Sequence, residues 1–213
     1  MTDEAPYNPL DTKNLGKSVA EALLDRDDHA IADIPRFVGS GIYVIYYMGD
    51  FELYRPMAEA NADELSWPIY IGKAVPSGGR RGTNLFQASK GSALFARLAD
   101  HRDSIEAAEN LDVSDFRVRY LIVEDIWIPL GESLLISTFK PVWNGMLDGF
   151  GNHDPGSGRY QGERPLWDMV HPGRRWAPRL RERAENAEQI GARVAEYLER
   201  HPAPRDAHMK FTP

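Results

Sequence analysis

Arg97 and His101 form a pair whose residue types and spacing suit chemistry on a phosphate. They are four residues apart in the segment 92–109, where apolar residues recur at helical spacing. Residues four apart lie on one face of a helix, and this pair lies on the shoulder of the apolar stripe. A half-buried histidine beside an arginine can handle a proton or a phosphate. The alternative is a pair of surface side chains whose apolar stems lie along the helix.

Glu132 is a carboxylate that its own helix should carry inward. It lies in the middle of the sector formed by Ile128, Leu135, Ile136 and Phe139. Burying an unpaired carboxylate costs on the order of several kcal/mol, so such a group needs a partner, a proton or a metal ion. A competing explanation places its charge near the positive end of the helix dipole, which contributes about 0.3–1 kcal/mol. That effect requires no burial, so it does not explain the inward direction.

Two short runs rich in tyrosine, 41–47 and 68–73, predict neighbouring strands. Each run is dense in β-branched and aromatic residues, and glycine or proline bounds it. Each also holds a tyrosine close to a glycine, so Tyr43 and Tyr70 could lie on one face of the sheet. The alternative is a tyrosine-rich β-hairpin with no catalytic function.

The rest of the pattern supplies the elements that must position these side chains. The segment 117–124 alternates and then becomes apolar, as a third strand does. Pro129 suits the first position of a helix and Pro141 ends it, so Glu132 lies on a helix. The other predicted elements are a first helix at 14–29, an excursion at 48–67 with a short helix at 56–60, a glycine-rich irregular region to 162, and a last helix at 178–200.

The composition is that of one ordinary globular domain, 1–213. The chain has 42% hydrophobic and 27% charged residues, a net charge of −7, and no cysteine for disulfides or thiolate metal sites. No apolar run approaches the roughly 20 residues of a membrane span, and the first residues show no export signal, so we expect a cytoplasmic protein. The acidic balance argues against a nonspecific nucleic-acid coat protein. Arginine is nevertheless concentrated locally, and the candidates for DNA contact are Arg80, Arg81, Arg159, Arg164, Arg174 and Arg175.

Several separated motifs occur together in the order of a known signature. Over 41–144 the chain resembles the GIY-YIG nuclease superfamily, and its layout outside this span is similar to that of the restriction endonucleases of the superfamily. The long excursion at 48–67 departs from compact members, which join the two motifs by a shorter link. The motifs are Gly41-Ile42-Tyr43, Tyr70-Ile71-Gly72-Lys73, Arg97 with His101, a helical Glu132, and Lys140-Pro141-Val142-Trp143-Asn144.

The resemblance implies an α+β fold, in which helices flank a small antiparallel three-stranded sheet. On this interpretation 41–144 is the catalytic core, 48–67 is an insertion, and 145–213 is a C-terminal helical extension. An N-terminal helix precedes the core, and all parts belong to one domain.

The resemblance also implies hydrolysis of DNA with one divalent metal ion, Mg²⁺, per active site. Glu132 would be its ligand, a hard oxygen donor, and Arg97 would contact the scissile phosphate. Tyr43 would be the general base. A phenol with a pKa of about 10 is ionised only to the order of 10⁻³ at neutral pH, so His101 would have to assist by accepting its hydrogen bond. Whether Tyr43 or His101 takes the proton from water stays open.

Three further residues would complete the site by the same resemblance. Tyr70 and Lys73 would bind the phosphate or hold the hydrogen-bond network, and Asn144 would position Tyr43 or the phosphate. Their alternatives are a core tyrosine, a solvated lysine and a helix-end asparagine.

The expected function is that of a type II restriction endonuclease that reads a short, GC-rich palindrome. Because such a site has two-fold symmetry, we expect a homodimer on double-stranded DNA. Arginine paired with guanine is the commonest specific contact. Two other functions remain open: a structure-specific repair or recombination nuclease, and a noncatalytic DNA-binding module that kept the fold. The intact set of candidate catalytic residues argues against the noncatalytic module.

Overall fold

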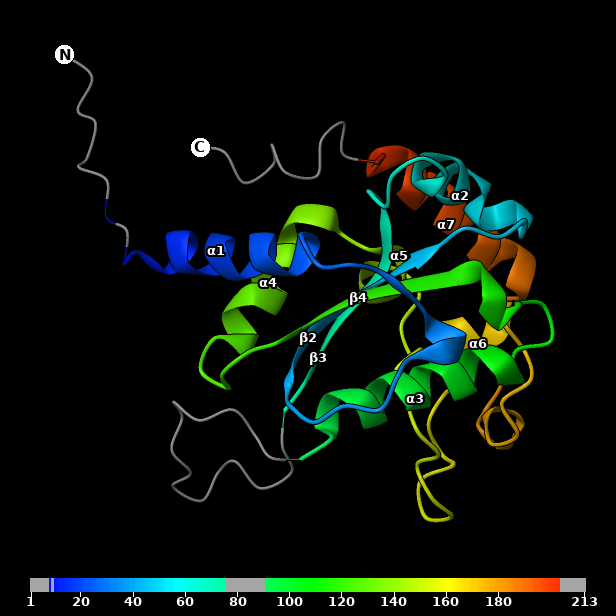
Figure 1. The fold of residues 1–213 in the computed structure, drawn as a ribbon. Coiled ribbons are helices and arrows are strands. Elements are labelled where there is room, and N and C mark those ends of the chain that lie inside the picture. The colour runs from blue at the N-terminus through cyan, green and yellow to red at the C-terminus, as the bar shows by residue number, and fades with distance from the viewer. Residues whose placement is uncertain (1–7, 9, 76–90, 204–213) are drawn as a thin grey trace.

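The computed structural model describes residues 8, 10–75 and 91–203, and Figure 1 shows how its elements are arranged. The strands are β1 (His29–Ala30), β2 (Gly41–Tyr47), β3 (Pro68–Ala74) and β4 (Phe116–Ile122). The helices are α1 (Thr12–Leu24), α2 (Arg55–Asn61), α3 (Ala93–Ala107), α4 (Ile128–Phe139), α5 (Val142–Gly145), α6 (Leu166–Val170) and α7 (Ala187–Arg200).

All strand pairs in the sheet are antiparallel, and the strand order is β1-β4-β2-β3. The predicted α+β class and the three strands of the core are confirmed. A three-stranded sheet is not, because His29 and Ala30 pair with β4 and add a fourth strand at its outer edge. Two residues are too few to show the alternating pattern of a strand. The first helix was predicted to reach His29, but α1 ends at Leu24, so His29 and Ala30 can pair with β4.

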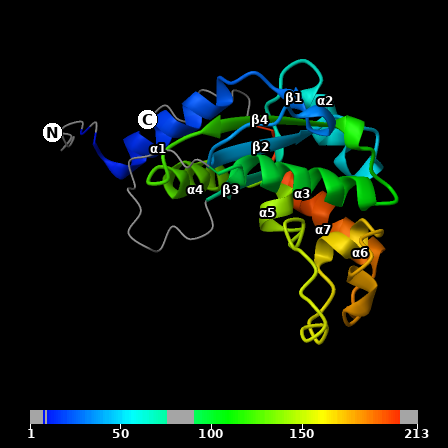
Figure 2. The same ribbon diagram turned by 60° about the horizontal axis from the view of Figure 1, so that its bottom comes forward.

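Different helices cover the two faces of the sheet. On β2, Ile42 and Val44 point to the face that packs against α1 and α4. Tyr43 and Ile45 point to the opposite face, whose core also includes residues of α3, α5 and α7. Figure 2 shows α6 and α7 grouped together beyond α3, away from α1. The central strand β2 is therefore covered on both faces and paired on both edges, and all its residues are buried.

The predicted insertion 48–67 carries α2, close to the short helix expected at 56–60. Asn61 fastens it to the sheet, because its side-chain amide donates to the carbonyls of Tyr47 and Trp67, both at 3.0 Å. Its carbonyl oxygen accepts from the backbone amides of Ser66 and Trp67. One buried side chain thus closes the excursion between the two motif strands.

The C-terminal helix was predicted to begin at Pro178, but α7 begins at Ala187. Asn186 caps it, accepting from the backbone of Gln189 while the Gln189 side chain accepts from the Asn186 amide. Before it, a 3-10 helix at Ala177–Arg179 is followed by irregular chain, in which the backbone amide of Arg181 donates to the carbonyl of Gly162. The short helix α6, earlier in the extension, was not predicted.

Within the described ranges, no helix combines the length and the apolar character required to cross a lipid bilayer.

Candidate active site

The two motif tyrosines project from neighbouring strands toward α3. Tyr43 on β2 is paired in register with Gly72 on β3, and the Tyr43 and Tyr70 ring centroids are 6.2 Å apart. The Tyr43 ring lies directly over the glycine: a Cβ at position 72 would come within 2.3 Å of the Tyr43 hydroxyl oxygen. Glycine at position 72 is therefore a steric requirement of the tyrosine opposite it.

A hydrogen bond joins His101 to Tyr43 on this face. The distance from the Tyr43 hydroxyl oxygen to His101 Nε2 is 2.5 Å, and both side chains are buried. Burial, helped by the charge of Arg97, lowers the pKa of His101 well below its usual value. Burial also raises the pKa of Tyr43. Both groups are therefore neutral at pH 7.

The sequence placed Arg97 and His101 together at the edge of the apolar stripe, half inside and half outside. The structure separates them: Arg97 is half-buried, whereas His101 is 1% exposed. Burial raises the pKa of Tyr43 and of Tyr70, and the positive charge of Arg97 beside both phenols opposes this effect. Arg97 Nη1 also donates to Nε2 of His153, at 3.0 Å. The site thus joins two phenols, one imidazole and one guanidinium.

Three residues of the glycine-rich region, Phe150, Gly151 and His153, belong to this site and were missed by sequence reasoning. The Phe150 ring stacks on His101 with centroids 4.4 Å apart and an interplanar angle of 13°. Gly151 lies against the Arg97 guanidinium, which is 2.5 Å from where a Cβ would be. The segment has no periodic pattern, so nothing local indicates that it folds back onto α3.

Lys73 and Glu132 form an ion pair on the other face of the sheet, where α4 packs. Lys73 Nζ lies 2.6 Å from Glu132 Oε2, and the Glu132 side chain is 15% exposed. Lys73 is paired in register with Ile42, whose side chain points to this face. Burial is the main cause of the raised pKa of Tyr70, and the negative charge of Glu132 adds to it, so this half-buried carboxylate lies near the site. The predicted inward direction of Glu132 agrees with this position.

Asn144 on α5 binds backbone, not the hydroxyl of Tyr43. Its side-chain oxygen accepts from the Ile71 amide and its NH₂ group donates to the Ile71 carbonyl, both at 2.8 Å. Because β3 is an edge strand, Asn144 satisfies groups that no further strand pairs. Its contact with the site is thus indirect, through the strand that carries Tyr70.

The arginines predicted to contact DNA differ widely in exposure. Arg159 and Arg175 are exposed, and Arg164 is half-buried, with Nε donating to the Ala177 carbonyl at 3.2 Å. Arg174 is 4% exposed, so its guanidinium offers no donor to DNA. Arg80 and Arg81 lie outside the described residues.

Glu132 is the residue that could hold a divalent metal ion. In the described part of the chain, no three His, Asp or Glu side chains are clustered to form a protein cage for a metal. A single half-buried carboxylate nevertheless fits Mg²⁺, which keeps several waters and takes phosphate oxygens as ligands.

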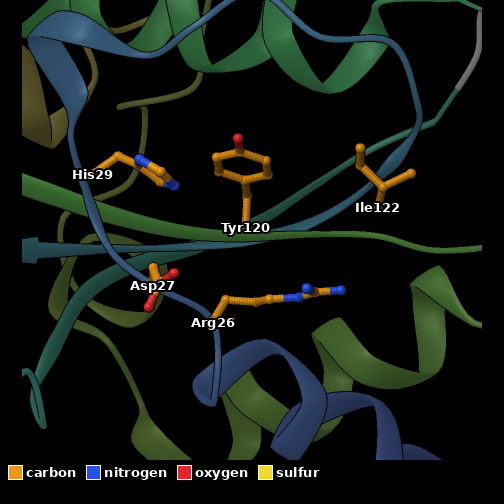
Figure 3. Close-up of a pocket in the computed structure, with 5 residues that line it drawn as sticks. All are labelled: Arg26, Asp27, His29, Tyr120 and Ile122. Carbon is orange, nitrogen blue, oxygen red and sulfur yellow. The ribbon is translucent and has the colours of Figure 1, made fainter.

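A separate pocket lies at the β1–β4 side of the sheet. It is lined by Arg26, Asp27, His29, Tyr120 and Ile122, and Figure 3 shows His29 and Tyr120 on the same side of the strands. None of the predicted site residues lines this pocket, so the chemistry assigned above does not depend on it.

The comparisons with known proteins agree with this geometry. The search of curated proteins returned no match. The family model described as the Eco29kI GIY-YIG domain matches residues 35–198, which include both motif strands, α3, α4 and most of the C-terminal region. The chain therefore belongs to the Eco29kI GIY-YIG family of restriction endonucleases and is a DNA endonuclease.

Proposed function

We propose that this endonuclease is a homodimeric type II enzyme that cleaves both strands of a short, GC-rich palindrome, with Tyr43 as general base and one Mg²⁺ bound at Glu132. The observation that carries the proposal is the 2.5 Å hydrogen bond between Tyr43 and a buried, neutral His101, with Arg97 beside it. The GC-rich site and the dimer rest on the likeness to restriction endonucleases and on the symmetry of a palindrome.

The Tyr43–His101 pair lets Tyr43 act as a base although the pKa of its phenol is high. Burial raises the pKa of Tyr43, which disfavours a free phenolate before substrate binds. As the Tyr43 oxygen takes a proton from the attacking water, its own proton can pass to Nε2 of His101. No phenolate then has to persist in the buried site, and the proton ends on the imidazole. This transfer combines the two possibilities left open by the sequence.

Arg97 supplies the positive charge for the developing phosphorane. Its guanidinium lies beside both phenols and donates to Nε2 of His153, so it is positioned before substrate arrives. Preorganised donors stabilise charge that develops in the transition state, because they need no reorganisation. Tyr70 holds the guanidinium from the other strand, and both side chains border the place where the scissile phosphate would lie.

Glu132 would hold the metal ion, with water and phosphate oxygens as the remaining ligands. When bound, Mg²⁺ supplies positive charge to the phosphate and to the leaving oxygen. Lys73 neutralises Glu132 in the protein without metal and, once released from this pair, can contact a phosphate oxygen. DNA contact is proposed for five arginines. Two are exposed and one is half-buried: Arg159 and Arg175, and Arg164. The other two are Arg80 and Arg81.

Glu132→Gln should abolish cleavage while leaving DNA binding intact, because it removes the charged ligand and keeps the shape of the side chain. The experiment incubates the wild type and this variant with a large plasmid and Mg²⁺, and sequences the fragment ends. Discrete bands with one common end sequence support the proposal, and DNA affinity is measured separately with Ca²⁺ in place of Mg²⁺.

The other outcomes assign the protein to a different class. Cleavage restricted to branched or flapped DNA would indicate a repair-type nuclease. Tight binding without cleavage on every substrate would indicate a noncatalytic module. Equal cleavage by the wild type and Glu132→Gln would exclude this carboxylate as the metal ligand.

A further inference from the structure

Arg174 is buried and all of its donor directions are used. Its Nε donates to Asp168 Oδ1 at 2.7 Å, and Nη2 donates to the other oxygen of the same carboxylate. The guanidinium carbon lies 4.6 Å from the ring centroids of both Trp167 and Trp176. The Arg174 and Asp168 side chains are 4% and 0% exposed. All the hydrogen-bond donors of this arginine are therefore used inside the protein.

The remaining donors of Arg174 bind one loop, residues 149–152. Nη1 donates to the carbonyls of Phe150 and Asn152 at 3.0 and 3.1 Å, and Nη2 donates to the carbonyl of Gly149 at 2.9 Å. Three carbonyls of four consecutive residues thus point at a single guanidinium. The Gly149 carbonyl also accepts from the backbone amide of Asn152 at 3.0 Å, so the loop is a turn, and the guanidinium binds that turn at three carbonyls.

That loop brings the extension into contact with the catalytic side chains. It carries Phe150, which stacks on His101 and also lies with its ring centroid 5.0 Å from that of Tyr70. It also carries Gly151 against the Arg97 guanidinium, and His153 follows directly. A shift of this loop would release the imidazole and the guanidinium together.

We propose that Arg174, held by Asp168, is a positioning residue of the nuclease site, which fixes the loop 149–152 so that Phe150 and Gly151 hold His101 and Arg97 in place. The proposal rests on the proposed function, in which those two side chains act on the phosphate. Arg174 itself touches neither DNA nor the reacting atoms.

Lysine cannot replace arginine in this role. A guanidinium offers five donors in a rigid plane, and here they reach a carboxylate and three carbonyls while the plane contacts two indole rings. A lysine has three donors on a flexible stem. It would keep the positive charge near Asp168 but lose the hydrogen bonds to the carbonyls of the loop 149–152. Burial raises the pKa of Asp168 despite the attraction of Arg174, so the carboxylate depends on its partner.

The test uses Arg174→Lys and Phe150→Leu in the full chain. For both, we expect the single-turnover cleavage rate to fall by about tenfold to a hundredfold, because displacing catalytic groups by about 1 Å costs that much. DNA affinity with Ca²⁺ should stay unchanged. The matched control is Arg117→Lys, because Arg117 also binds a carboxylate, that of Asp28 at 2.5 Å, but at the β1–β4 edge of the sheet. We expect this control to cleave at the wild-type rate.

A second readout does not depend on activity. The stacked Phe150 ring shifts the proton resonances of the His101 imidazole, so NMR of ¹³C-histidine protein should show those resonances moving in Arg174→Lys and Phe150→Leu, and staying in Arg117→Lys. If the wild type cleaves no DNA, the proposed function fails, and the NMR result still decides whether Arg174 positions His101.

Two results would overturn the proposal. One is an unchanged cleavage rate and unchanged His101 resonances in a folded Arg174→Lys protein. The other is wild-type behaviour of Phe150→Leu, which keeps the arginine and removes only the ring that reaches His101. This second variant decides the question even if Arg174→Lys fails to fold.

Discussion

The hydroxyl group of Tyr43 is the smallest part of this protein whose loss should stop the reaction. It shares a hydrogen bond with His101, lies beside the positive charge of Arg97, and lies over the backbone of Gly72. Each contact comes from a different position in the chain, so the oxygen is held without freedom to rotate away. Its ring is buried on a face shared by two strands and α3, and a phenylalanine fits the same space.

Tyr43→Phe should reduce the single-turnover cleavage rate by about 10²–10⁴-fold, the usual contribution of a general base. It should also destabilise the fold by about 1–3 kcal/mol, because Nε2 of His101 loses its donor in a buried site. Cleavage kinetics at saturating enzyme and urea unfolding measure the two effects. The control is Tyr120→Phe, since Tyr120 is the register neighbour of Tyr43 on β4. Near-normal turnover of Tyr43→Phe would remove the phenol from the mechanism.

The pairing of β2 with β3 is the element-scale feature that builds the site. Because Tyr43 is paired with Gly72, the tyrosine ring can cross the neighbouring strand and reach α3. Asn144 completes β3 from the outside by binding Ile71. The strand that carries the second motif is thus held on one side by β2 and on the other by an asparagine side chain.

Gly72→Ala should displace the Tyr43 ring and lower the cleavage rate by about 10²-fold, with a loss of about 1–3 kcal/mol in stability. The added methyl would come within 2.3 Å of the Tyr43 hydroxyl oxygen, which cannot move without breaking its bond to His101. Gly191→Ala is the opposite case: a Cβ on this residue of α7 meets nothing within 4 Å. We expect that variant to gain about 0.5–1 kcal/mol in stability and to cleave normally. Equal behaviour of the two variants would show that position 72 needs no glycine.

On the scale of the whole molecule, two buried tyrosine–histidine pairs tie distant segments together. One is Tyr43–His101 at the site. In the other, the hydroxyl of Tyr54 in the insertion lies 2.6 Å from Nε2 of His171 in the extension and accepts from Trp143 Nε1 at 2.9 Å. Burial lowers the pKa of His171 to about 3, so this imidazole is neutral like that of His101. The second pair is fully enclosed and joins the insertion to the extension.

Acid should therefore unfold the protein through these two histidines. In the unfolded chain a histidine takes up a proton as the pH falls below 6.5, whereas the folded His171 does so only near pH 3. The unfolded state binds more protons within this window, so stability is full above pH 6.5 and falls by about 1.4 kcal/mol per pH unit for each histidine. Urea unfolding between pH 7 and pH 4 measures the slope. His171→Gln should reduce this slope by about 1.4 kcal/mol per pH unit, the contribution of one histidine. An unchanged slope would show that His171 does not contribute to acid unfolding.

Much of the fold could be predicted because its signals are local. The strands around Tyr43 and Tyr70 follow from short apolar runs, and α3 and α4 follow from helical periodicity and proline positions. The direction of Glu132 was also predictable, since a helix face is a property of spacing alone. β1 is too short to produce a pattern. The start of α7 depends on the cap at Asn186 and on the contact between Arg181 and Gly162, which spacing does not reveal.

The candidate site divides in the same way. The sequence by itself determined the family signature and the order of Tyr43, Tyr70, Arg97, His101 and Glu132, because motif spacing is written along the chain. Only the tertiary structure decided that His101 is buried and hydrogen bonded to Tyr43 and that Asn144 binds the edge strand. The contact of the loop 149–152, which Arg174 holds, with the site also became visible only in the tertiary structure. These results depend on side chains about 20 to 80 residues apart meeting in space, and local propensity carries no information about such contacts.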